Sequence, residues 1–93
     1  MARYLMIGKY STESIKEISP NRTEKAIRLI TELGGEVNAM YAVLGGFDLV
    51  LIVDFAENET AMKASLGLTM LTGVSFTTYP MVDVSDFDNI LSK

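Results

Sequence analysis

The sequence predicts an α+β fold whose elements follow the order strand, helix, strand, strand, helix, strand, with a short helix after the last strand. Three observations lead to this order. Residues 47–55 form a strand-like segment whose middle is apolar without interruption. A segment with helical apolar spacing lies on each side of it, and glycine ends each one. A glycine pair at 45–46 joins two strand-like segments, as in a hairpin.

The central segment, residues 47–55, is apolar on both of its faces. Side chains alternate along a strand, so Val50 and Ile52 point away from their neighbours. A strand with one face in water would alternate apolar and polar residues, whereas an unbroken run means that both faces are covered. The residues that share the opposite face are Phe47, Leu49, Leu51, Val53 and Phe55.

The first strand is expected at residues 4–10. Leu5 and Ile7 share one of its faces, and Tyr4 and Met6 share the other. Because both faces are apolar, alternation alone does not say which one meets the helices. We expect Leu5 and Ile7 to do so.

The first long helix is expected over residues 20–33. Ser19 suits the N-cap and Pro20 suits the first helical position. Gly34 and Gly35 then end the helix, because glycine adopts the left-handed conformation of a C-cap. The expected buried stripe comprises Thr23, Ala26, Ile27, Ile30 and Leu33.

The second strand is expected at residues 36–44, and the second long helix runs from an N-cap at Asn58 to Gly73. Gly67 lies in the middle of this helix at a cost of roughly 1 kcal/mol relative to alanine, which indicates a close approach by another element. The expected buried stripe comprises Ala61, Ser65, Leu68 and Leu71, widened by Met62 and Leu66.

The last strand is expected at residues 74–82, at an edge of the sheet because Pro80 cannot donate a ladder hydrogen bond. A short terminal helix follows at residues 83–91, with Ser85 as its cap. This order is the ferredoxin-like βαββαβ plan, with two helices on one face of a four-stranded antiparallel sheet.

The other sheet face is predicted to be bare and apolar. If Leu5, Ile7 and Phe76 face the helices, the bare face gains Tyr4, Met6, Tyr79 and Met81. An exposed apolar face of this size favours association. We therefore expect a homo-oligomer, a dimer or a multiple of dimers, in which two sheets pack face to face.

Composition excludes several functions. The 93 residues carry a net charge of −4, so we expect no nucleic-acid or membrane partner. The chain has neither Cys nor His, which removes thiolate chemistry, the commonest general base and most transition-metal sites. The glycine pair precedes a strand, unlike a dinucleotide loop, so no cofactor is expected. We expect one domain over residues 1–93 and, because the N-terminus lacks a signal-peptide pattern, a cytoplasmic protein.

Three stretches, YLMIGKYS, LGGEV and GGFDLVLIVDF, have a spacing that resembles the GYD domain family, small proteins named for a Gly-Tyr-Asp tripeptide. The tripeptide maps onto Gly46, Phe47 and Asp48, where phenylalanine replaces tyrosine and its hydroxyl is lost. The resemblance covers nearly the whole chain and implies a dimeric α/β barrel, without an activity. Similar sheets serve as ligand-sensing domains of leucine-responsive regulators and as cofactor-independent monooxygenases, and these analogies concern fold alone.

The sequence leaves the function open. Asp48 either caps its own turn or presents a carboxylate at the mouth of the space between two sheets. Tyrosines on a sheet usually pack, but several together would orient a flat ligand with polar edges. The leading hypothesis is a small-molecule-binding module; the alternatives are an enzyme without cofactor, which would resemble a monooxygenase, and a purely structural association domain. The candidate ligand-binding residues are Tyr4, Met6, Tyr41, Asp48, Thr77 and Tyr79.

Overall fold

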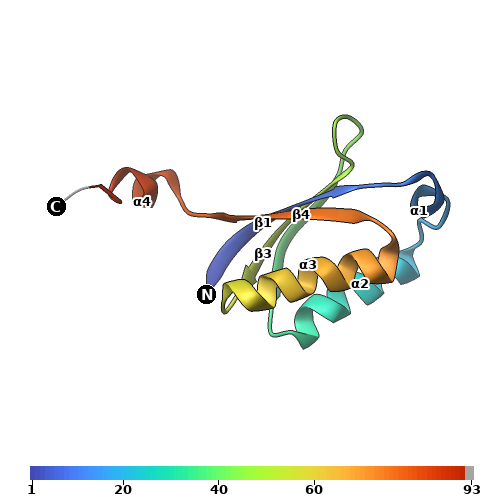
Figure 1. Cartoon of the computed structure of the whole chain (residues 1–93), viewed down its shortest axis with the longest axis horizontal. Helices are drawn as coiled ribbons and strands as arrows, with labels where there is room; N and C mark the ends of the chain where they lie inside the picture. The colour runs from blue at the N-terminus through green and yellow to red at the C-terminus, as the bar shows by residue number, and fades with distance from the viewer. Residues whose placement is uncertain (92–93) are drawn as a thin grey trace.

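The computed structural model describes residues 1–91 and confirms the predicted α+β order. Figure 1 shows the helices α2 and α3 side by side beneath one face of the sheet, and no helix of residues 1–91 covers the other face. The elements are β1 (Ala2–Lys9), α1 (Thr12–Lys16), α2 (Pro20–Glu32), β2 (Glu36–Ala42), β3 (Leu49–Phe55), α3 (Asn58–Thr72), β4 (Ser75–Met81) and α4 (Val84–Asp88).

The four strands form one antiparallel sheet in the order β2-β3-β1-β4. The predicted central position of β3 is confirmed, since it pairs with β2 on one side and with β1 on the other. Strand β4 lies at an edge, as Pro80 predicts. The other edge strand, β2, contains a bulge between Val37 and Ala39.

The expectation that Tyr4 and Met6 lie on the bare face is wrong. Both side chains are buried toward the helices, and that of Met6 is 0% exposed. The register places Tyr4 opposite Val53 and Met6 opposite Leu51, and cross-strand partners share a face. Since Leu51 and Val53 belong to the core beneath the sheet, Tyr4 and Met6 follow them there. The alternate residues of β1 therefore occupy the bare face.

The hydroxyl of Tyr4 ties the sheet to the start of α3. It donates a hydrogen bond to the Asn58 side chain, and the ring meets Phe55 edge to face with centroids 5.9 Å apart. Asn58 was predicted to be the N-cap of this helix, but it is the first helical residue and the N-cap is Glu57. The same correction applies to α4, where Asp83 and not Ser85 is the N-cap.

Helix α3 buries part of the expected stripe: Ala61 and Leu68 are buried as expected, whereas Leu71 is exposed. Met62 and Leu66 point to solvent, and Leu66 is 67% exposed. The buried residues of α3 are Ala61, Ala64 and Leu68. The sequence misleads here because α3 is apolar around most of its circumference, so the small alanines can face the core. The close approach predicted at Gly67 is confirmed, since a Cβ there would lie 3.3 Å from Leu29 of α2.

The glycine pair after α2 has two different roles. Gly34 has φ +81°, the left-handed conformation that ends the helix. Gly35 lies against the core: a Cβ added there would be 2.6 Å from the ring of Phe55 and 2.8 Å from Ile30. Any side chain at position 35 would therefore collide with the core.

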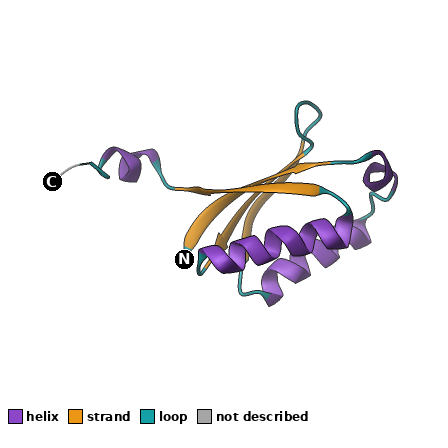
Figure 2. Cartoon of the chain, in the orientation of Figure 1, coloured by secondary structure: helices purple, strands orange, loops and turns teal. Residues whose placement is uncertain are grey.

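The chain beyond β4 forms an arm that stands away from the body of the molecule. We call residues 82–91 the C-terminal arm; they include α4 and extend from the end of the sheet (Figures 1 and 2). The arm exposes apolar side chains, among them Val84 and Phe87. Within residues 1–91, no helix has the length and apolar character needed to cross a bilayer.

Candidate functional site

The bare face of the sheet is organised in cross-strand rows. One row joins Tyr41, Val50, Ile7 and Thr77, and the next joins Ala39, Ile52, Leu5 and Tyr79. The third row, at the end of the sheet where the arm begins, joins Glu36, Asp54, Arg3 and Met81. The face thus changes from apolar over its middle to charged at the arm end.

An ion pair dominates the charged row. The Arg3 guanidinium donates from Nε to Asp54 Oδ1 at 3.0 Å and from Nη2 to Asp54 Oδ2 at 3.5 Å. The hydrogen bond from Arg3 lowers the pKa of the Asp54 carboxyl, and Asn38 acts in the same direction. The same contact raises the pKa of Arg3. Both groups are therefore charged at neutral pH.

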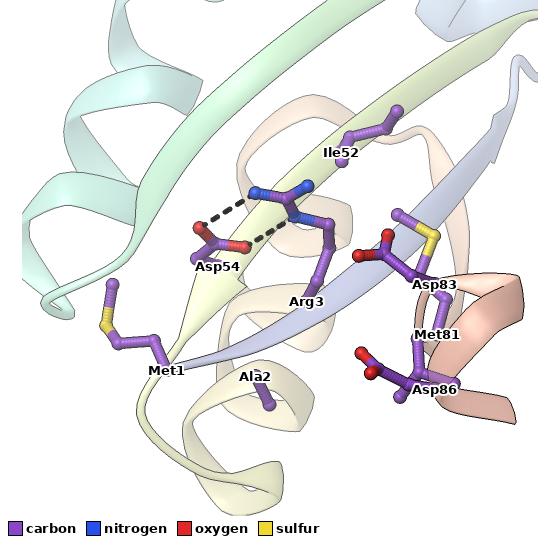
Figure 3. A pocket seen from close by; sticks show the side chains of 9 residues that line it. Met1, Ala2, Arg3, Ile52, Asp54, Met81, Asp83 and Asp86 are labelled. Atoms are coloured by element: carbon purple, nitrogen blue, oxygen red, sulfur yellow. Dashed lines mark hydrogen bonds and ion pairs between the residues drawn. The ribbon is translucent and has the colours of Figure 1, made fainter. Parts of the chain in front are cut away.

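A surface cavity of about 470 Å³ lies beside this pair, in the corner between the sheet and the arm. Figure 3 shows Arg3 and Asp54 on one side of it and the carboxylates of Asp83 and Asp86 on the other. One guanidinium therefore faces three carboxylates. The apolar part of the lining is Met1, Ala2, Ile52, Met81 and Val82. The cavity can hold a molecule that has an apolar body and a cationic group.

Asp48 lies at the opposite end of the sheet. It is buried, and its carboxylate accepts a hydrogen bond from the backbone N–H of Tyr10 at 2.9 Å. Lys9 Nζ lies 3.8 Å from the same carboxylate. The Asp48 backbone N–H donates to the Gly8 carbonyl, and its carbonyl accepts from Val43. Asp48 thus anchors the β2–β3 loop, residues 43–48, to the end of β1 and does not cap its own turn.

The structure divides the residues predicted to bind a ligand. Tyr41, Thr77 and Tyr79 share the bare face, although Tyr41 and Tyr79 lie on opposite edge strands, about 14 Å apart by strand spacing. Tyr4 and Met6 lie beneath the sheet. Tyr4 and Met6 therefore cannot line a space above the sheet together with Tyr41, Thr77 and Tyr79.

Sequence reasoning missed Arg3, Asp83 and Asp86. Along the chain, Asp54 lies just before α3 and the aspartates after β4 lie around α4, and carboxylates near a helix start need no further role. The register of β1 would have revealed the Arg3–Asp54 pair, because pairing Leu5 with Ile52 places Arg3 opposite Asp54.

Comparison with known proteins identifies a family and a fold. The family described as GYD domain matches residues 4–91. Among solved structures, the leucine response regulatory protein LrpA of Mycobacterium tuberculosis matches with a TM-score of 0.59 and 13% identity, over 88% of this chain and 51% of that one. A glycine-to-threonine mutant of Rv3291c matches with a TM-score of 0.59 and 13% identity, over 89% of this chain and 51% of that one.

The chain thus spans about half the length of these structures. At such identities the likeness establishes the ferredoxin-like fold alone. No curated protein matches the chain.

Proposed function

The chain belongs to the GYD domain family, and from this premise we propose that it is a homo-oligomeric module that binds a small molecule beside its sheet-to-sheet interface. The observation that carries the proposal is the cavity that adjoins an uncovered apolar sheet face. Its volume, about 470 Å³, falls within the range of roughly 300–1,000 Å³ that is typical of ligand sites.

The bare face supports association between copies. Its two apolar rows contain the half-buried side chains of Leu5, Ile7, Val50 and Ile52, with no covering element in residues 1–91. A second copy laid against this face removes those side chains from water and forms the dimeric α/β barrel. Tyr41, Thr77 and Tyr79 would then border the space between the sheets. The cavity at Arg3 would lie at the rim, open to an arriving ligand.

The charges in the cavity define the ligand class. Arg3 is already paired with Asp54, and among residues 1–91 the three carboxylates of the cavity outnumber its two cations, Arg3 and the N-terminal amine of Met1. A ligand with a protonated amine satisfies these carboxylates, while Ile52 contacts its apolar part. We therefore propose small amines with an aliphatic or aromatic body as the ligand class.

Thermal-shift titration tests the proposal with matched probes. Hexylamine is expected to raise the melting temperature, and hexanoate, which has the opposite charge on the same apolar chain, is not. Leucine belongs in the panel because one structurally similar protein is named for a response to it. Asp86→Asn should weaken the response, whereas Asp88→Asn, a change on α4 outside the cavity lining, should not. Equal melting-temperature shifts with both probes, or no shift with either, would refute the binding of small amines. Association between copies would then be the one role left for the bare face.

A further inference from the structure

The tip of the β2–β3 loop is apolar and firmly held. Leu44 at the tip is 90% exposed, and Val43 and Phe47 are exposed beside it. Surface loops are ordinarily polar, so an apolar tip on a loop whose base is anchored through the Asp48 carboxylate favours contact with a partner. Figure 1 shows this loop rising on the side of the sheet opposite the helices, the side on which a second copy would lie.

The base of the C-terminal arm supplies a matching hollow. Pro80, Met81, Val82, Val84 and Phe87 line a depression of about 450 Å³, a volume larger than a few apolar side chains. Phe87, one of these lining residues, is 66% exposed. The chain therefore carries both an apolar projection and an apolar receptor for one.

The projection and the hollow lie at opposite ends of the same sheet. The loop is anchored where β1 ends, since the Asp48 N–H donates to the Gly8 carbonyl. The arm begins at the other end, where Met81 pairs with Arg3. The loop lies toward the β2 edge and the arm continues from β4 at the other edge, so the two occupy diagonally opposite corners of the sheet. A two-fold axis between two stacked sheets, perpendicular to the diagonal that joins these corners, exchanges them. Each loop then meets the arm of the other copy, and the contact occurs twice.

We infer that the β2–β3 loop tip of each copy inserts into the hollow at the base of the partner's C-terminal arm. This inference rests on the sheet-to-sheet dimer proposed above and specifies its orientation. It makes the arm, which stands free of its own body, part of the other subunit's surface. Because the arm also carries Asp83 and Asp86, the partner's loop would close one side of the ligand cavity.

Charge and area both favour a second copy of this chain as the occupant. Lys9 lies at the base of the loop, 3.5 Å from the Gly45 carbonyl, and the arm carries three aspartates, Asp83, Asp86 and Asp88. Head-to-tail stacking brings these opposite charges together. The sheet face alone offers about 400 Å² of projected area by strand length and spacing. A stable interface buries about 800 Å² per partner, and the two loop–arm contacts supply the missing area.

Disulfide trapping tests the inference cleanly because the chain contains no Cys. Leu44→Cys and Val84→Cys are made as separate variants, one with a mass tag, then mixed and oxidised with diamide. The mixture is expected to give a covalent heterodimer on a non-reducing gel, and either variant alone should give little. Within one chain, the two positions lie at opposite ends of strands about 25 Å long, too far for a disulfide. In the control mixture, Glu24→Cys, on the exposed side of α2, takes the place of Leu44→Cys beside Val84→Cys.

The outcomes separate this inference from the proposed dimer. Strong cross-linking of either single variant with itself would show that loop meets loop or arm meets arm, and would overturn the orientation. A dimer by light scattering that gives no cross-link in the mixture would also overturn it, with the dimer retained. A wild-type protein that is monomeric would remove both proposals.

Discussion

Replacing Leu5 by lysine separates the two faces of the sheet. Leu5 lies in the middle row of the bare face, between Ile52 and Tyr79. The next residue, Met6, points to the helices and is fully buried. Leu5→Lys therefore places a charge at the centre of the proposed interface, and Met6→Lys places the same charge in the core of one subunit. Each variant introduces one lysine in place of one large apolar residue, and the two differ in the face of the sheet that they alter.

The magnitude follows from burial. Fully burying a leucine side chain is worth roughly 1.5–3 kcal/mol, and an unpaired buried ammonium costs several kcal/mol more. Because a two-fold axis repeats the change, the dimer contains two such lysines. We expect Leu5→Lys to weaken dimerisation by at least about 4 kcal/mol, a factor of about 10³ in Kd. Met6→Lys should prevent folding at every concentration, since small domains have only about 5 kcal/mol of stability to lose.

Light scattering and urea unfolding over a dilution series measure these effects. The wild-type unfolding midpoint should rise with protein concentration, because subunit association stabilises the folded state by mass action. The Leu5→Lys midpoint should lie lower and be independent of concentration. A variant at Leu5 that stays dimeric, or a wild-type protein that stays a folded monomer at micromolar concentration, would refute the placement of the interface on this face.

Three further expectations concern single sites. Asp48→Ala should lower the free energy of unfolding by about 2 kcal/mol, because it leaves the half-buried N–H of Tyr10 without an acceptor. Asp48→Asn keeps an acceptor and should lower it by about 1 kcal/mol or less. Chemical denaturation measures both losses, and equal losses would contradict this role. Gly35→Ala should lower the free energy of unfolding by about 2–3 kcal/mol, because the added methyl group collides with the core. Gly34→Ala should lower it by about 1 kcal/mol, because position 34 has a positive φ. Calorimetry should therefore give Gly35→Ala the lower melting temperature. By NMR titration, the lowered pKa of Asp54 should rise toward its ordinary value of about 4 in Arg3→Gln. An unchanged pKa of Asp54 in the variant would argue against the pair. Because the pKa of Asp54 is lower in the folded state than in the unfolded state, the pair stabilises the fold above pH 4, and this contribution is lost as the pH falls below it.

Much of the fold was predictable because its signals are local. The glycines that end α2 and α3, the serine and proline that start α2 and the apolar run of β3 each act over a few residues. The order of elements and the central position of β3 follow from them. The face of β1 was not predictable in this way. Leu5 and Met6 are similarly apolar, and only the long-range register with β3 decides which of them enters the core.

The candidate site was harder to predict for the same reason. Asp54 and Arg3 are 51 residues apart in sequence, and only the register of two antiparallel strands makes them a pair. Asp83 and Asp86 line the cavity because the C-terminal arm begins beside the end of β1, and no local pattern encodes that position. The sequence did mark Asp48 as a candidate site residue. Its hydrogen-bond partner Tyr10 is 38 residues away, so local sequence patterns could not identify the contact.

The two edges of the sheet bear on how far assembly can proceed. Unpaired edge strands invite further strands to add, and repeated addition leads to fibres. Here the bulge between Val37 and Ala39 distorts the outer ladder of β2, and Pro80 removes a donor from that of β4. Strand addition is therefore disfavoured at both margins, while the flat face is left open to one neighbour. In the proposed dimer, association ends at a closed pair, so the protein should stay soluble at concentrations at which an unprotected apolar sheet would polymerise.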